Sequence, residues 1–171
     1  MHFYWAQLTS FKANWPEARW RQLKARNNIH NSGVINIIDA GEKDNIHPKY
    51  KTEVGLRFEG LALREVYARK DVHPYSPEFK LANYSGDTAK VLFNTFGRNI
   101  QLRGKARGFE VKVAGKWQNA NATLSGNEVL VKSTNGGKVE GVRYLWKGWA
   151  DPDVCLFNQD GLPVFSFTNE K

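Results

Sequence analysis

Asp44 and His47 are the residues of this sequence whose types and spacing could perform acid–base chemistry. A histidine can act as a general base when its second ring nitrogen donates a hydrogen bond that fixes the tautomer. A carboxylate three residues earlier can accept that bond and can stabilise the imidazolium that forms on proton transfer. The D-x-x-H segment therefore predicts the orienting and proton-transferring half of a hydrolase triad.

The element before this segment is predicted to be a β-strand. Residues 34–38 read Val-Ile-Asn-Ile-Ile, a run rich in β-branched side chains, and the turn residues Asn-Ser-Gly precede it at 31–33. In open α/β sheets, functional sites form at the carboxyl ends of the strands. The predicted strand therefore places four residues where chemistry is usually found: Asp39, Gly41, Asp44 and His47.

The element after the segment is predicted to be an amphipathic helix over 48–69. Proline is favoured in the first turn of a helix, so Pro48 puts His47 at or near the N-cap with its side chain free to face a cleft. Apolar residues then recur at intervals of three and four. A simpler interpretation stays open, because a helix-capping aspartate beside a surface histidine would also explain the short D-x-x-H pattern.

Length and composition predict two unequal parts. The chain has 171 residues, 41% of them hydrophobic, so it can bury a core. A change in composition near 71–74 separates an α/β region, 1–70, from an all-β region, 71–171. In the second region, short runs of alternating or buried character are separated by glycine-containing turns, which predicts a β-sandwich-like arrangement. These runs lie at 90–93, 109–113 and 128–131.

The first region is predicted to need covering by other polypeptide. Only two strands are expected there, at 3–8 and 34–38, and two strands do not make an independently stable sheet. Their unpaired edges and apolar side chains need a partner. We expect this partner to be an upstream polypeptide, a partner chain or another copy of the same chain. Without it, exposed apolar side chains are expected at Phe3, Trp5, Ile35 and Ile37.

Several stretches carry a family likeness: Phe3 to Leu8 with Trp15-Pro16-Glu17, Gly33 to His47 (GVINIIDAGEKDNIH), Lys49 to Tyr67, and Val142 to Trp146 with Leu156-Phe157-Asn158 and Gly161-Leu162-Pro163. In these stretches the chain resembles the sialate O-acetylesterase family of SGNH/GDSL-type serine esterases. The resemblance implies the C-terminal part of an SGNH-hydrolase-like α/β domain followed by a β-sandwich-like region. It also implies that His47 is the general base and Asp44 its orienting partner in the removal of acetyl esters from sugars.

The nucleophile that such an enzyme requires is not visible in the sequence. None of the serines lies in a G-D-S or G-x-S-x-G context. The resemblance places the serine and the oxyanion hole upstream of Met1, so the chain alone is predicted to be inactive. The expected substrate is an acetylated sugar, either a sialic acid ester or another glycan such as acetylated xylan. The serines present are Ser10, Ser32, Ser76, Ser85, Ser125, Ser133 and Ser166.

Other functions have weaker support in the sequence. The net charge of +8 and a cluster of basic and aromatic residues over 15–26 could contact nucleic acid, but no binding motif accompanies them. The expectation there is a helix whose basic residues, Arg19 among them, form a solvated face. A carbohydrate-binding β module without catalysis is the alternative function. Its platform would be Tyr144, Trp146, Trp149 and Phe157, although aromatic residues in a β-rich region more often form core.

The sequence predicts no metal site, cofactor or membrane span. The four histidines have no metal-ligand spacing, and Cys155, the one cysteine, is expected to be a buried small hydrophobic residue. No apolar run is long enough to cross a bilayer, and no signal peptide begins at Met1. Localisation stays open, because a signal in upstream sequence would make the protein secreted or periplasmic.

Overall fold

The two strands expected in the first region are present, and both are shorter than predicted. The structure is a computed structural model that describes residues 1–170. Strands β1 (Phe3–Ala6) and β2 (Ser32–Ile35) pair in parallel. Strand β2 ends because Asn36 turns the chain: its side chain accepts the Ile38 N–H at 3.1 Å and donates to the Pro163 carbonyl at 3.0 Å. A short 3-10 helix, η2 (Ile38–Ala40), follows.

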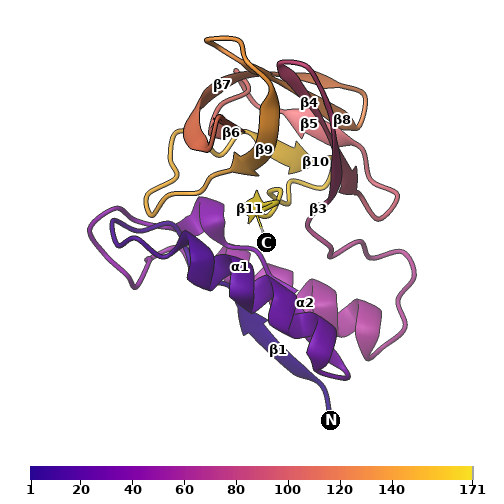
Figure 1. The fold of residues 1–171 in the computed structure, drawn as a ribbon. Coiled ribbons are helices and arrows are strands. Elements are labelled where there is room, and N and C mark those ends of the chain that lie inside the picture. The colour runs from indigo at the N-terminus through magenta and orange to yellow at the C-terminus, as the bar shows by residue number, and fades with distance from the viewer. Residues whose placement is uncertain (171) are drawn as a thin grey trace.

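Helices α1 (Pro16–Ala25) and α2 (Thr52–Glu65) cover opposite faces of this strand pair, and a 3-10 turn, η1 (Arg26–Asn28), follows α1 (Figure 1). Successive side chains of a strand point to opposite faces. On β2, Val34 accordingly packs in a cluster with Leu23 of α1, and Ile35 packs with Leu61 of α2. Residues 1–70 thus form a small three-layer α/β arrangement.

The predicted helix over 48–69 is shorter at both ends than expected. Helix α2 begins at Thr52 with Lys51 as its N-cap residue, so Pro48 lies ahead of the helix and His47 is not at its N-cap. Glu42 accounts for the later start, because its carboxylate accepts the Lys49 N–H at 2.7 Å and holds the segment before α2 in a turn. The prediction that His47 is anchored on the helix end is therefore wrong.

The prediction of exposed apolar side chains in the first region is confirmed only in part. Phe3 on β1 is 52% exposed, and Trp5 is partly buried. Ile35 and Ile37 are 2% and 8% exposed, because α2 covers them within this chain. The expectation of exposed apolar residues was wrong for these two isoleucines.

The second region is all β, as predicted, but its strands form one curled sheet. The seven strands follow the order β11-β9-β6-β7-β8-β4-β3, and β3 and β4 also contact β9, so the sheet is nearly closed (Figure 1). A second, two-stranded sheet pairs β10 with β5. The strands are β3 (Glu78–Ser85), β4 (Thr88–Asn94), β5 (Ile100–Leu102), β6 (Phe109–Val113), β7 (Lys116–Ser125), β8 (Glu128–Ser133), β9 (Val139–Tyr144), β10 (Leu156–Asn158) and β11 (Phe167–Thr168).

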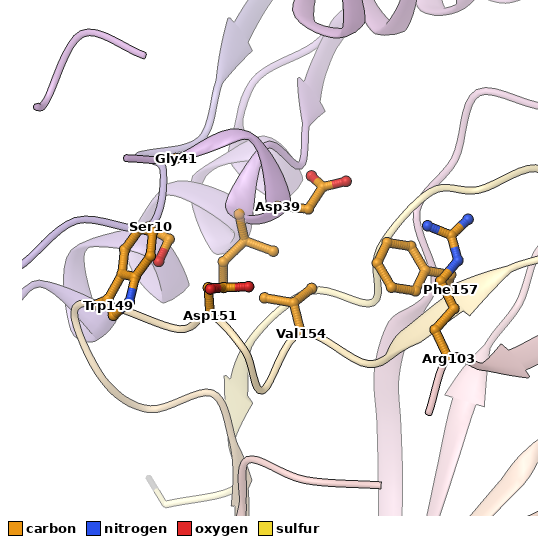
Figure 2. Close-up of a pocket in the computed structure, with 9 residues that line it drawn as sticks. Ser10, Asp39, Gly41, Arg103, Trp149, Asp151, Val154 and Phe157 are labelled. Atoms are coloured by element: carbon orange, nitrogen blue, oxygen red, sulfur yellow. The ribbon is translucent and has the colours of Figure 1, made fainter. Parts of the chain in front are cut away.

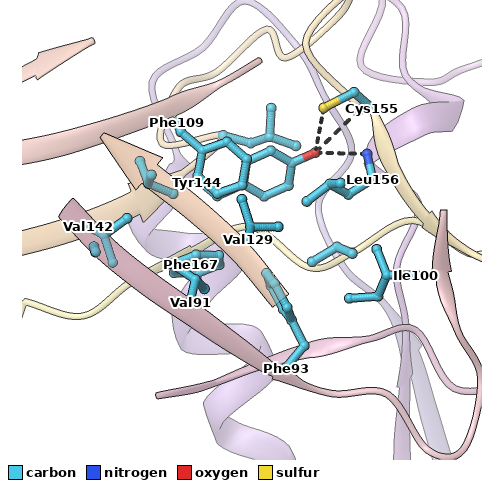
Figure 3. Packing of buried hydrophobic residues seen from close by; sticks show 14 of the residues in the cluster. Val91, Phe93, Ile100, Phe109, Val129, Val142, Tyr144, Cys155, Leu156 and Phe167 are labelled. Carbon is cyan, nitrogen blue, oxygen red and sulfur yellow. Dashed lines mark hydrogen bonds between the residues drawn. The ribbon is translucent and has the colours of Figure 1, made fainter. Parts of the chain in front are cut away.

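The core explains why one sheet replaces the expected sandwich. Alternate side chains of the strands point inward and meet across the curled sheet, so they bury one another without a second large sheet. Burying each such aliphatic side chain contributes about 1.5–3 kcal/mol. Among the fully buried residues are Val91, Val111, Val129, Val131 and Val142 (Figure 3).

The two regions share this core. Ile38, from the first region, belongs to the same cluster as the strands of the curled sheet. Phe165, from the second region, packs with Leu23 and Val34 between α1 and β2. No helix within residues 1–170 combines the length and the apolar character needed to cross a bilayer.

Candidate functional site

Asp44 and His47 lie in an irregular segment, residues 41–51, that follows the carboxyl end of β2 and precedes α2. Both residues are exposed. The segment is shaped by side-chain hydrogen bonds to its own backbone, including one of 2.9 Å from the His47 N–H to Asn45 Oδ1. Both residues therefore lie beyond the carboxyl end of β2, as the sequence predicts, but on a loop instead of at the end of a helix.

The Asp44 carboxylate contacts a lysine and not the histidine. Its Oδ1 lies 3.2 Å from Lys12 Nζ, and the two side chains are 74% and 59% exposed. Within residues 1–170, no hydrogen bond joins the side chains of Asp44 and His47. An exposed ion pair of this kind contributes only about 0.2–1 kcal/mol. A change of partner by Asp44 would cost little, so the Asp44–His47 dyad stays a prediction.

Asp39, the first acid after β2, has a structural role. Both of its carboxylate oxygens accept hydrogen bonds of 2.7 Å from the guanidinium of Arg57 on α2, and Arg57 also donates to the Asn36 carbonyl. The Arg57 side chain is only 10% exposed. This two-point bond joins the end of β2 to α2, so Asp39 is not free to serve as a catalytic acid.

Two glycines bring three loops together beside the D-x-x-H segment. A β-carbon on Gly41 would lie 2.0 Å from the Ser10 carbonyl oxygen, and one on Gly148 would lie 2.1 Å from that of Ala13. Only glycine permits these backbone approaches. The Ser10 hydroxyl then accepts the Ala150 N–H at 2.6 Å. The loops after β1, β2 and β9 are thus layered on one another.

Arg19 on α1 ties the same loops together and was missed by the sequence analysis. Its side chain is fully buried, not solvated as expected, and it donates to the carbonyls of Thr9, Leu145, Lys147 and Gly148. Burial lowers the pKa of Arg19 to about 10. The sequence did contain a signal for the burial of Arg19. Arg19 lies four residues before the apolar Leu23, and residues four apart lie on one helix face.

A cavity of about 480 Å³ opens between the two regions, against these layered loops (Figure 2). One wall includes Ser10 and Trp149, and the other includes Phe157 with the Arg103 guanidinium over its ring, 3.8 Å from the centroid. The remaining lining residues are Ile38, Asp39, Gly41, Asp151 and Val154.

None of the serines within residues 1–170 hydrogen-bonds to His47. Ser10 is 1% exposed and bonded to the loop after β9, and Ser133 donates to the Gly136 carbonyl at 2.7 Å. Ser166 is fully buried. No serine in the described part of the chain is therefore in place to act as a nucleophile activated by His47.

The aromatic residues considered for a sugar platform divide into two pairs. Tyr144 and Phe157 are 0% and 5% exposed and belong to the interior. Trp146 and Trp149 are partly exposed, and Trp149 borders the cavity. The prediction that Cys155 is buried is confirmed, since it is 2% exposed. Over residues 1–170, no three histidine, cysteine or acidic side chains gather as metal ligands would.

This chain is similar in structure to a known enzyme. No protein-family model matches the sequence, and no curated protein matches it significantly. The structure is similar to a carbohydrate acetylesterase from Xanthomonas citri, with a TM-score of 0.92 and 31% sequence identity. The match covers 99% of this chain and 41% of that one, so this chain spans well under half of the acetylesterase's length. The likeness extends over both regions and supports a relationship to the carbohydrate esterases.

Proposed function

We propose that this chain is the Asp–His-bearing, C-terminal part of a carbohydrate O-acetylesterase of the SGNH type. The observation that carries the proposal is the 31% identity and TM-score of 0.92 with part of a carbohydrate acetylesterase. The exposed position of Asp44 and His47 beyond the carboxyl end of β2 supports the assignment of their roles. The narrower assignment to sialate O-acetylesterases, as opposed to enzymes acting on acetylated xylan, rests on the sequence resemblance.

In the proposed reaction His47 is the general base and then the general acid. It removes the proton from a serine hydroxyl as the serine oxygen attacks the acetyl carbonyl. It then gives that proton to the sugar oxygen as the ester bond breaks. In the second half, His47 takes a proton from water as the water oxygen attacks the acetyl-serine, and it then gives that proton to the serine oxygen as acetate is released. Asp44 accepts the hydrogen bond from the other ring nitrogen after it leaves Lys12.

The serine and the oxyanion hole are proposed to come from an upstream polypeptide. The absence of a serine bonded to His47 within residues 1–170 supports this, as does the 41% coverage of the acetylesterase. Phe3 on β1 is 52% exposed and the sheet has two strands, which supports docking of the upstream polypeptide against β1. A partner chain or a second copy of this chain are the other candidates for covering that edge.

Acetate release from an acetylated sugar tests the proposal. The chain alone should be inactive, and the chain joined to the segment encoded directly upstream of Met1 should be active. His47→Ala should then reduce kcat/KM by about 10²- to 10⁴-fold, the usual contribution of general acid–base catalysis. Asp44→Asn should also reduce it, whereas His30→Ala, at another exposed histidine, should not. Full activity of the His47→Ala variant would refute the proposal.

The alternative is a carbohydrate-binding module without catalysis. The partly exposed Trp149 beside the cavity favours it. It predicts glycan binding by the isolated chain and no acetate release under any of the conditions above. Because binding and hydrolysis are measured separately, the two functions can be told apart.

A further inference from the structure

The cavity between the two regions is bordered by polar side chains that are open to solvent and form no hydrogen bond within residues 1–170. Asp39 is neutralised by Arg57. Asp151 and Arg103, by contrast, make no side-chain hydrogen bond or ion pair within residues 1–170, and the indole N–H of Trp149 is likewise unbonded there. A carboxylate acceptor, a guanidinium donor and an indole face and N–H therefore border one hollow of about 480 Å³ (Figure 2). Small-molecule sites usually have volumes of about 300–1,000 Å³.

We propose that this cavity binds a neutral sugar residue. Sugar hydroxyls can donate to the Asp151 carboxylate and accept from the Arg103 guanidinium, while an apolar ring face lies against the indole of Trp149. The charges favour a neutral ligand, because Asp151 balances Arg103 and Asp39 is already paired with Arg57. A carboxylate on the ligand would meet the Asp151 carboxylate as well as the Arg103 guanidinium, so the lining offers it no net attraction.

The loop that carries Trp149 and the Arg103 guanidinium are held in place before any ligand arrives. The Ser10 hydroxyl bonds to the Ala150 N–H at 2.6 Å, Arg19 donates to the carbonyls of Lys147 and Gly148, and Gly148 packs against the Ala13 backbone. These contacts lie on both sides of Trp149 in the chain. On the other wall, the ring of Phe157 supports the Arg103 guanidinium. Preorganised groups lose less entropy on binding, which favours affinity for a weak ligand such as a sugar.

The cavity is connected to the D-x-x-H segment through shared loops. Gly41, which lines the cavity, is three residues before Asp44. Ser10, whose carbonyl packs against Gly41, is two residues before Lys12, which binds Asp44. If the proposed function holds, the cavity would receive a sugar residue of the same glycan that carries the acetyl ester at His47. Since the cavity is proposed to bind a neutral sugar, the substrate would then be an acetylated neutral polysaccharide in place of a sialic acid ester.

Binding to unacetylated probes tests this inference independently of hydrolysis. Xylotetraose and cellotetraose serve as neutral probes and 3′-sialyllactose as the acidic one, each titrated into the chain by calorimetry or NMR. At least one neutral probe should bind, and Trp149→Ala or Asp151→Asn should weaken it by at least about tenfold. Trp117→Ala is the matched control, since Trp117 is a partly exposed tryptophan on β7 outside the cavity. The Trp117→Ala variant should bind the neutral probe with the same affinity as the unaltered chain.

Three results would overturn the inference. They are no binding of either neutral probe, binding by the Trp149→Ala and Asp151→Asn variants that is as tight as binding by the unaltered chain, or preferential binding of 3′-sialyllactose. Thermal melting of each variant checks that the fold is retained. His47→Ala should bind the neutral probe normally. Binding that persists when acetate release fails in every form of the protein would leave the sugar site standing and refute the esterase.

Discussion

At the residue scale, Asp44 and Arg19 are both bonded to groups that lie far from them in the sequence. The exposure of His47 and the burial of Cys155 agree with simple expectations about their surroundings. The pairing of Asp44 with Lys12 was not expected, because Lys12 lies on a loop 32 residues away in the sequence and no local pattern connects the two residues. Arg19 shows the same limit, since its carbonyl acceptors at 145–148 are far from it in sequence.

Replacing Arg19 should destabilise the protein strongly. Arg19→Ala leaves the carbonyls of Leu145 and Lys147 without a donor within residues 1–170, and hydrogen bonds to a charged group contribute about 1.5–3 kcal/mol each. We expect a loss of about 3 kcal/mol or more in the free energy of unfolding, measured by urea denaturation. Arg21→Ala on the same helix is the control: Arg21 is exposed and paired with Glu17, so its loss should change stability by about 0.5 kcal/mol or less. Equal effects of the two substitutions would contradict the structural role of Arg19.

At the element scale, period and turn residues predicted three strands of the curled sheet. The runs at 90–93, 109–113 and 128–131 lie in β4, β6 and β8, since side chains that alternate between core and solvent leave a period of two in the sequence. The ends of α2 were not predictable in this way, because Glu42 stops the helix from beginning at Pro48. Whether strands form a sandwich or one curled sheet depends on non-local pairing, which the alternation does not encode.

Tyr144 connects the end of β9 to β10 and gives a test at this scale. Its buried hydroxyl accepts the N–H groups of Cys155 and Leu156, both at 3.3 Å (Figure 3). Tyr144→Phe leaves both donors unpaired, so the free energy of unfolding should fall by about 1–3 kcal/mol. Urea denaturation at neutral pH measures it. An unchanged midpoint would show that these contacts do not stabilise the junction.

The same tyrosine predicts a dependence on alkaline pH. Burial, followed by the nearby Cys155, raises the pKa of Tyr144 well above its ordinary value. Above about pH 10 the unfolded tyrosine loses its proton while the folded one keeps it, so the unfolded state binds fewer protons and stability falls as pH rises. The urea midpoint should therefore decrease from about pH 9 to about pH 11, and less steeply in Tyr144→Phe. Parallel slopes in the two proteins would contradict this assignment.

At the scale of the whole molecule, the two regions pack against each other as one unit. Ile38 and Phe165 each pack across the boundary near residue 70, which composition alone presented as a division between domains. The composition does reflect the change from α/β to all-β structure. What it could not reveal is that α2 buries Ile35 and Ile37, leaving Phe3 on β1 as the exposed side chain.

Docking of the proposed upstream polypeptide should be visible at β1. Within residues 1–170, no strand lies beside the β1 amides that point away from β2, because the pair forms a two-stranded sheet. Adding the upstream segment should slow their hydrogen exchange, measured by mass spectrometry or NMR. Amides of β8, which lies between β7 and β4 in the curled sheet, should be unaffected. Activity restored without any protection of β1 would place the docking surface elsewhere.

The labelling of a serine by a fluorophosphonate measures most directly whether this chain supplies half of a triad. Such a reagent reacts with a serine that an adjacent histidine activates, and general-base assistance accelerates this by about 10²-fold or more. We predict that this chain accelerates labelling of a serine in the proposed upstream polypeptide, that the His30→Ala variant does so equally, and that the His47→Ala variant does not. Equal acceleration by the His47→Ala chain, or labelling of a serine within residues 1–171, would contradict it.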